Sequence, residues 1–382
     1  MPVYKVDGVK KDGLQKYNVR INYISDSGKA KQLTRTAYGL EQAKELERQL
    51  HHELKTKGEQ TAKKMTFLQL YEEYISVKKY EIRESTLDKF KRNVGYHLMP
   101  FFKDVRIDRI TVDMLKNWKL SVEEKNLKLK SKKNAYGDLR VILNYAVRME
   151  YLAKNPLVKI GNFKDGSGIT LKQEMGFYTP EQFRAFIGVA RTFAEEKQER
   201  HKDLSEWHFY VFFNIAFYTG LRKGEIHALK WSDIDGSYLS VKRSVTQKLK
   251  GEDRETLPKN KSSVRTLQLP LPLIRVLGEH KERLTQSDGF SDDSRVCGND
   301  RCLRDTTIQK RNVLYAETAG LKTIRIHDFR HSHVSVLANE GINIQEIARR
   351  LGHAKIEMTW NTYSHLYPRE EEKAVDILNK IA

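Results

Sequence analysis

The sequence predicts a multidomain α+β protein with three parts. These are a small N-terminal three-stranded sheet with one helix, an all-helical bundle, and a mostly helical C-terminal domain with a small antiparallel sheet. A chain of 382 residues is too long for one ordinary core, so two or three domains are expected. Apolar residues alternate with a period of two near the N-terminus, whereas helical spacing prevails from residue 66 to about residue 159.

Residues 1–62 are predicted to form the first domain. Residues 15–24 and 30–37 alternate polar with apolar or β-branched side chains, and a turn-forming stretch separates them, which predicts a β-hairpin. Leucines at helical spacing over residues 40–54 predict a helix. The basic and amide side chains of the strands fit two interpretations equally well: a ribbon that enters a DNA major groove, or an ordinary solvated sheet face.

Residues 63–165 are predicted to form the helical second domain, and most of the chain's positive charge lies there. Residues 63–172 hold 24 basic and 13 acidic side chains, a net +11 of the chain's +19. A basic helical unit can bind DNA phosphates independently of sequence. Surface solvation explains one lysine cluster, such as that in Lys125–Lys133, but explains a domain-wide excess less well.

The third domain is predicted to span residues 173–382, after a polar linker over Gly161–Gly176. Thr179 followed by Pro180 is typical of a helix start. No run of about 18 apolar residues occurs and the N-terminus lacks an apolar signal core, so a cytoplasmic protein without a membrane partner is expected. Cys297 and Cys302 are too few for a disulfide framework or a zinc site, and free thiols are expected.

Four segments of the third domain carry residues suited to phosphate chemistry. Arg222 follows the point where an apolar helix breaks at Gly220, so its side chain can face a pocket. Lys259 lies at the tip of a predicted hairpin, where an ammonium group could protonate a departing oxygen, and Lys261 is a close competitor. Each of these two segments is weak evidence when taken alone.

The other two segments carry histidine, arginine and tyrosine. His327 and Arg330 are three residues apart and therefore project from one helical face, where both can bind one phosphate. A helix over residues 344–351 is predicted to end at a glycine just before His353, and Tyr363 follows ten residues later. A hydroxyl nucleophile thus follows three candidate anion-binding groups.

The order and spacing of these four segments resemble the tyrosine recombinase family, the phage integrases and their relatives on conjugative transposons. The resemblance implies that Arg222, His327 and Arg330 bind the scissile phosphate, that Tyr363 is the nucleophile, and that Lys259 is the acid. It also implies that His353 supports the site and that Glu225 orients it. No metal or cofactor is expected, because two guanidiniums can meet the charge of the transition state and no carboxylate pair accompanies the motifs.

The resemblance also implies partners. Residues 1–62 resemble an arm-site DNA-binding domain and residues 63–165 a core-site DNA-binding domain, which implies double-stranded DNA with two kinds of attachment site. A homotetramer acting through a four-way junction and an accessory excisionase or DNA-bending protein are implied as well. An amphipathic helix is expected over residues 369–382, docked either on its own domain or on a neighbouring subunit.

Tyr363 is preferred as the nucleophile over Tyr218, Tyr315 and Tyr367 because it alone has the family's spacing from His353. A tyrosine of ordinary pKa near 10 needs a proton acceptor at neutral pH, and His327 is a plausible one. His331, His333 and His365 are interpreted as neighbours without a direct role. Two alternatives stay open: a resolvase or invertase of the same chemistry, and a noncatalytic DNA-binding regulator that kept the fold.

Overall fold

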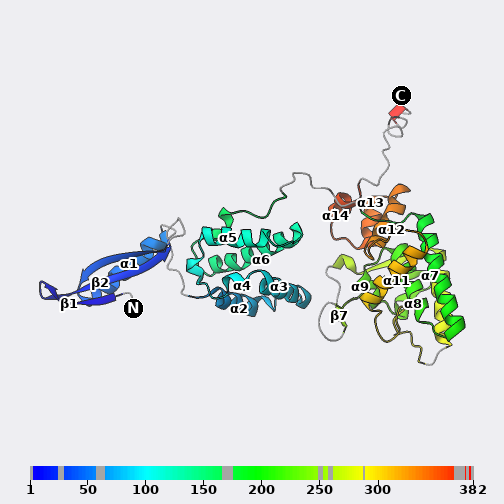
Figure 1. Ribbon diagram of the computed structural model, residues 1–382, viewed down its shortest axis with the longest axis horizontal. Helices are drawn as coiled ribbons and strands as arrows, with labels where there is room; N and C mark the ends of the chain where they lie inside the picture. The colour runs from blue at the N-terminus through cyan, green and yellow to red at the C-terminus, as the bar shows by residue number, and fades with distance from the viewer. Residues whose placement is uncertain are drawn as a thin grey trace. The chain divides into compact units, whose positions relative to one another are not determined.

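The computed structural model describes residues 3–24, 30–56, 65–165, 175–247, 253–256, 261–286 and 289–364, together with residues 375, 378 and 379. The chain divides into two compact units, Met1–Leu171 and Lys172–Ala382 (Figure 1). The predicted proton donor Lys259, and nearly all of the predicted tail helix 369–382, lie outside the described residues.

A three-stranded antiparallel sheet opens the first unit, as predicted. Its strands are β1 (Val3–Lys11), β2 (Leu14–Ile24) and β3 (Ala30–Tyr38), hydrogen-bonded in that order. Helix α1 (Leu40–Thr56) packs against the sheet (Figure 1). The alternation of the strands buries one row of side chains under the helix, and the resulting core comprises Val19, Ile21, Ala37, Ala43, Leu50 and Leu54.

A helical bundle with its own core follows in the first unit. Its helices are α2 (Phe67–Lys78), α3 (Glu84–His97), α4 (Met99–Phe102), α5 (Val112–Glu123) and α6 (Leu129–Arg148), with short 3₁₀ turns at Ile107–Arg109 and Pro156–Lys159. Thr66 caps α2 by accepting a hydrogen bond from the Gln69 amide. The core of the bundle shares no residue with the core of the sheet, so the first unit contains two separate cores.

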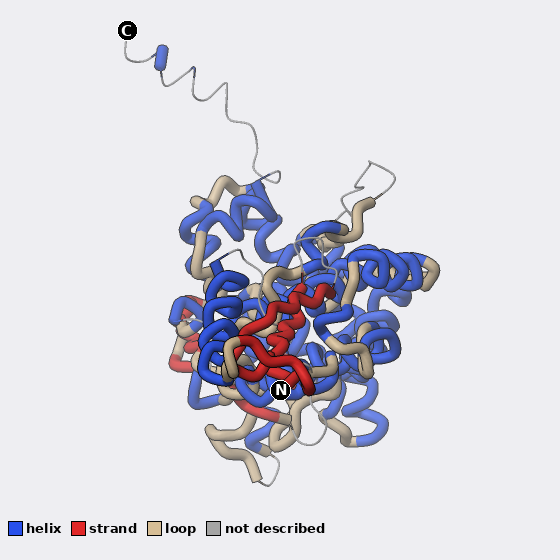
Figure 2. Tube along the Cα trace, turned by 90° about the vertical axis from the view of Figure 1, so that its left-hand side faces the viewer, coloured by secondary structure: helices blue, strands red, loops and turns tan. Residues whose placement is uncertain are grey.

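The second unit is mostly helical. Its helices are α7 (Pro180–His201), α8 (Ser205–Thr219), α9 (Lys223–Ala228), α10 (Leu271–Thr285), α11 (Asp305–Thr318), α12 (Asp328–Asn339), α13 (Ile344–Leu351) and α14 (Ile356–Tyr363). Thr179 caps α7 with Pro180 in its first turn, as predicted. Nearly every residue of α8 is buried, and α7, α10 and α12 pack against it, so α8 is the central helix. Figure 2 shows helices as most of the described chain, with few strands.

Two small antiparallel sheets complete the second unit. Strands β4 (Ile234–Asp235), β5 (Tyr238–Val241) and β8 (Arg265–Gln268) form one sheet, with 3₁₀ turns at Trp231–Asp233 and Lys261–Ser263. Strands β6 (Ser244–Thr246) and β7 (Arg254–Thr256) form the other. The sequence predicted a single lysine-tipped hairpin here. Strands β5 and β8 do pair, but a second hairpin is inserted between them because the intervening segment is long enough to pair with itself.

Two further expectations concern the described residues. None of the helices within these ranges is long and apolar enough to cross a bilayer. Cys297 and Cys302 are both buried free thiols, as expected from their number. The described part of the chain also contains no cluster of three His, Cys, Asp or Glu side chains that could hold a metal ion.

Candidate active site

Arg222 is the N-cap residue of the short helix α9, two residues after Gly220, a position that only glycine fits. Gly220 ends α8 with a φ of +63°, and a Cβ there would lie 2.8 Å from the ring of His333. The chain then turns into α9, whose first turn brings Glu225 back to Arg222. The Glu225 carboxylate accepts hydrogen bonds from the Arg222 amide and from its Nη1, both at 2.9 Å. The guanidinium is therefore fixed in direction while 37% of the side chain stays exposed.

Glu225 also accepts a second guanidinium, which the sequence analysis did not single out. Arg265 Nη2 donates to Glu225 Oε2 at 2.9 Å, and Arg265 Nε donates to the Arg350 carbonyl at 2.6 Å. Burial raises the pKa of Glu225, but the charges of Arg265 and Arg222 outweigh that effect and hold the pKa below its usual value. Arg265 thus ties Glu225 to the end of α13. Arg265 lies two residues before buried Leu267 and so shares its face of β8, which was the available signal.

Arg330 is a buried guanidinium at the centre of the site, with 2% of its surface exposed. Its Nη1 donates to the Gly220 carbonyl at 2.8 Å and its Nη2 to the Leu351 carbonyl at 2.7 Å. Burial and the nearby charge of Arg222 lower its pKa to about 9, so the group stays charged at neutral pH. One side chain therefore joins the end of α8 to the end of α13 and brings two predicted phosphate-binding arginines together.

His353 contacts the guanidinium of Arg330. Arg330 Nη2 is 2.8 Å from His353 Nε2, and His353 Nδ1 is 2.8 Å from Thr359 Oγ1. Because a guanidinium can only donate, Nε2 accepts and the ring proton is on Nδ1. Burial and the charge of Arg330 lower the pKa of His353 to about 4, which keeps the ring neutral. His353 therefore orients Arg330, and the left-handed Gly352 before it (φ +65°) allows the chain to turn.

His327 is the residue immediately before α12, one turn before Arg330. Desolvation and the positive charges of Arg330 and Arg222 lower its pKa. Its carbonyl accepts a hydrogen bond from the Arg330 amide at 3.2 Å. His327 therefore lies next to Arg330, which reaches the Gly220 carbonyl two residues before Arg222, and these two arginines form the cationic group of the site.

Tyr363 ends α14 and packs into a small apolar cluster with Val334 and Leu351, leaving 2% of its surface exposed. Burial raises its pKa to about 12, whereas the charges of Arg330 and Arg222 act in the opposite direction. The hydroxyl is 2.6 Å from Nδ1 of His331. The sequence pattern assigned His331 no direct role, so this contact was not predicted.

The remaining candidates either make other contacts or are not described. Lys259 lies outside the described residues, and for Lys261 the structure gives only the backbone, in the 3₁₀ turn before β8. Tyr315 is fully buried and donates at 2.7 Å to Glu206, which also accepts from Arg311. His333 is hydrogen-bonded through Nδ1 to the Phe217 carbonyl at 2.9 Å. Tyr363 is therefore the described tyrosine that lies with the cationic group.

This helical fold, with two arginines, histidines and a tyrosine brought together from distant segments, is that of a DNA strand transferase of the tyrosine type. The family model for the phage integrase family matches residues 178–370, half of the chain, and that for the phage integrase N-terminal SAM-like domain matches residues 66–119. The chain therefore belongs to the phage integrase family. Its reaction is site-specific DNA recombination.

Individual relatives support this assignment. The chain is 28% identical over 385 residues to the ICEBs1 integrase of Bacillus subtilis (strain 168), covering 98% of this chain and 99% of the relative. It is 31% identical over 264 residues to a XerC-like tyrosine recombinase of Caldanaerobacter subterraneus subsp. tengcongensis, covering 64% of each chain.

Solved structures share the fold. A Tn1549 transposon integrase in complex with a circular intermediate DNA matches with a TM-score of 0.64 at 20% identity, covering 83% of this chain and all of that one. A lambda integrase dimer bound to a COC′ core site matches with a TM-score of 0.56 at 16% identity, covering 97% and 95%. At these identities the likeness concerns the fold alone.

Proposed function

We propose that this chain integrates and excises a mobile element by cutting and rejoining DNA through a 3′-phosphotyrosyl bond to Tyr363 and a Holliday junction. The observation that carries the proposal is the convergence of Tyr363, Arg222 and Arg330, which lie far apart in the sequence. Arg330 links the three: its guanidinium donates to the Gly220 carbonyl, two residues before Arg222, and to the carbonyl of Leu351, which packs in the same cluster as Tyr363. Because the hydroxyl is buried, it has to become accessible to the phosphate when DNA binds.

In this proposal the cationic group binds the scissile phosphate. Arg222 is half-exposed and held by Glu225, so its remaining donors can meet a nonbridging oxygen. Arg330, oriented by His353, supplies further positive charge where the pentavalent transition state becomes more negative, and the neutral ring of His327 can donate a hydrogen bond there. Lys259 is the proposed donor of a proton to the departing 5′ oxygen, with Lys261 as the competing candidate.

The domain boundaries belong to the proposal as well. Residues 1–62 would bind arm sites, residues 63–165 core sites, and residues 173–382 would carry the chemistry. The separate cores of the sheet, the bundle and the C-terminal unit support three folding units, and the net charge of +11 over residues 63–172 supports DNA binding by the bundle.

The assembly follows from the reaction. Two duplexes each cut on two strands need four active sites, so a homotetramer on DNA is proposed, with an excisionase or a DNA-bending protein controlling direction. The similarity to the ICEBs1 integrase supports a mobile element as the source of this chain, and the cytoplasm is the proposed compartment.

Deletion of the residues after Tyr367 would test where the C-terminal tail docks. Unchanged tetramer assembly on DNA would rule out docking of the tail on a neighbouring subunit.

Nicked suicide duplexes test the nucleophile, because loss of the short strand traps the covalent intermediate. The wild-type protein should give a protein–DNA band that survives detergent, and Tyr363→Phe should give none. Tyr367→Phe is the matched control and should keep the band. A trapped band with Tyr363→Phe would remove Tyr363 from the mechanism.

A further inference from the structure

His331, the residue directly after Arg330, is hydrogen-bonded to the hydroxyl of Tyr363. Its Nδ1 lies 2.6 Å from Tyr363 Oη, and the centroids of the two rings are 5.4 Å apart. His327, by contrast, contacts the ring of His331, with 5.3 Å between ring centroids. The hydroxyl of Tyr363 is therefore hydrogen-bonded to His331, within α12, and not to His327, just before it.

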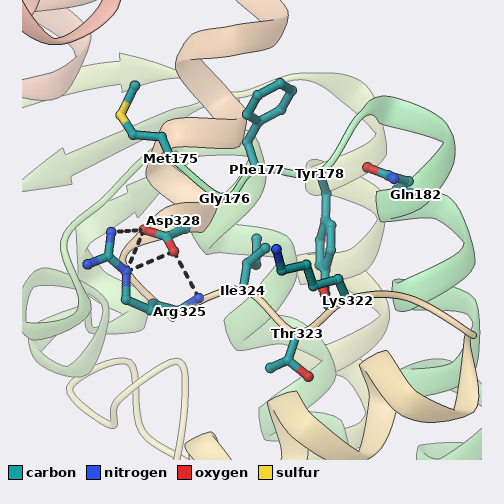
Figure 3. A pocket seen from close by; sticks show the side chains of 10 residues that line it. All are labelled: Met175, Gly176, Phe177, Tyr178, Gln182, Lys322, Thr323, Ile324, Arg325 and Asp328. Carbon is teal, nitrogen blue, oxygen red and sulfur yellow. Dashed lines mark hydrogen bonds and ion pairs between the residues drawn. The ribbon is translucent and has the colours of Figure 1, made fainter. Parts of the chain in front are cut away.

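The protonation of His331 follows from its other neighbour. Asp328 Oδ1 lies 3.7 Å from His331 Nε2, and Arg325 holds the same carboxylate through Nε and Nη2 (Figure 3). A fixed negative charge beside Nε2 favours the tautomer that carries its proton there. The lone pair of Nδ1 is then directed at Tyr363, whose O–H donates to it.

At neutral pH the charge states leave Nδ1 of His331 unprotonated and the phenol of Tyr363 protonated. Burial, with the neighbouring His327, lowers the pKa of His331 to about 4, so the ring is neutral at neutral pH. Burial raises the pKa of Tyr363 to about 12, so the phenol keeps its proton until it attacks. The titratable and charged groups that face His331 are His327, Asp328, Arg325, Arg330 and Tyr363.

We propose that His331 accepts the proton of Tyr363 as the phenol attacks DNA, an inference that rests on the proposed function. The Oη–P bond forms and the P–O5′ bond breaks, the tyrosine proton passes to Nδ1, and the departing 5′ oxygen takes a proton from Lys259. On rejoining, every bond and proton change reverses. Proton transfer accompanies bond formation, because the electron pair of Oη then enters the new P–O bond and no buried phenolate has to form.

Two substitutions separate proton transfer from simple positioning. His331→Asn keeps an amide oxygen as a hydrogen-bond acceptor without basicity, whereas His331→Ala removes the contact. Single-turnover cleavage of the nicked duplex by the full-length chain should fall by roughly 10²–10⁴-fold in both variants at neutral pH. The defect should shrink as pH rises, since hydroxide then removes the proton. DNA affinity and melting temperature of His331→Asn should stay close to wild type.

His280→Gln is the matched control, because His280 is a buried histidine of the same domain whose Nε2 donates to the Val296 carbonyl at 3.0 Å, outside the cationic group. It should cleave at the wild-type rate. Wild-type activity of His331→Asn, with or without a defect in His331→Ala, would overturn proton transfer to His331.

DNA with a 5′-bridging phosphorothiolate distinguishes the base from the acid, because its thiolate leaves without protonation. Lys259→Ala should be rescued by this substrate and His331→Asn should not. Rescue of His331→Asn would place the histidine on the leaving-group side and overturn the inference. Absence of a covalent band from the wild-type protein would instead overturn the proposed function itself, and the inference with it.

Discussion

The helical bundle and the C-terminal domain use their charged side chains in opposite ways. Among the described residues of the bundle, His97 is the one buried polar side chain, and the core is otherwise apolar. The C-terminal domain buries Arg330 and Glu225, and Arg265 with 6% of its side chain exposed. Burying a charge is costly unless it is paired, so each of these groups is held by several partners. The bundle therefore keeps its charges at the surface, where they can act at long range, whereas the C-terminal domain holds charges in its interior at contact distance.

Among the tests of this contrast, the largest effect is expected at Arg330. Arg330→Lys loses the fork that reaches both the Gly220 and Leu351 carbonyls, so the phosphate-binding group is no longer fixed. Single-turnover cleavage should fall by roughly 10²–10³-fold. Arg349→Lys on the exposed face of α13 is the control and should cleave normally. Normal cleavage by Arg330→Lys would show that the buried guanidinium is structural.

Arg265→Ala is expected to act mainly on stability. The substitution leaves the buried carboxylate of Glu225 with only Arg222, and breaking a buried ion pair typically costs about 3 kcal/mol of unfolding free energy. Urea denaturation followed by tryptophan fluorescence measures the loss. Arg349→Ala, which breaks an exposed pair with Glu346, should cost less than about 1 kcal/mol. Equal losses from both variants would contradict the contrast between buried and exposed charges.

Acid should destabilise the C-terminal domain through its buried histidines. Burial lowers the pKa of His280 to about 3 and that of His208 to about 4. Between the ordinary value of 6.5 and these values only the unfolded chain binds the proton, so stability is lost as pH falls below 6.5. His280→Gln should reduce the stability difference between pH 7 and pH 5 by about 2 kcal/mol. An unchanged difference would mean that the histidine is not buried neutral.

The smallest single effects are expected in the bundle. Lys128, Lys130 and Lys133 are exposed near the start of α6. Each change to alanine should weaken DNA binding about equally for all sequences and reduce the salt slope by about one. Affinity titrations at several salt concentrations measure this, and the Lys→Arg variants should keep the slope. A loss specific to one DNA sequence would assign base readout to the bundle.

Much of the fold was predictable because it depends on local rules. The alternation of β2 and β3, the Thr179 cap and the glycine ends of α8 and α13 all appear as predicted. The inserted hairpin of β6 and β7 was not predicted. Its strands are three residues each, too short for a periodic pattern to stand out.

The site divides in the same manner. Arg222, His327, Arg330, His353 and Tyr363 follow from recurring spacings, and the structure brings these residues together. The contacts of His331 and Arg265 do not follow from spacing. Whether His331 or His327 meets Tyr363 depends on how α14 packs against α12, and Arg265 reaches Glu225 across 40 residues of chain. Tertiary packing decides both.

The central claim is that the phenol of Tyr363 forms the covalent bond to DNA. Peptide mapping by mass spectrometry of the adduct trapped on a nicked duplex tests it most directly. The account predicts a nucleotide joined through its 3′ phosphate to the peptide that contains Tyr363. A nucleotide on Tyr315, on Tyr367 or on a serine would contradict the account.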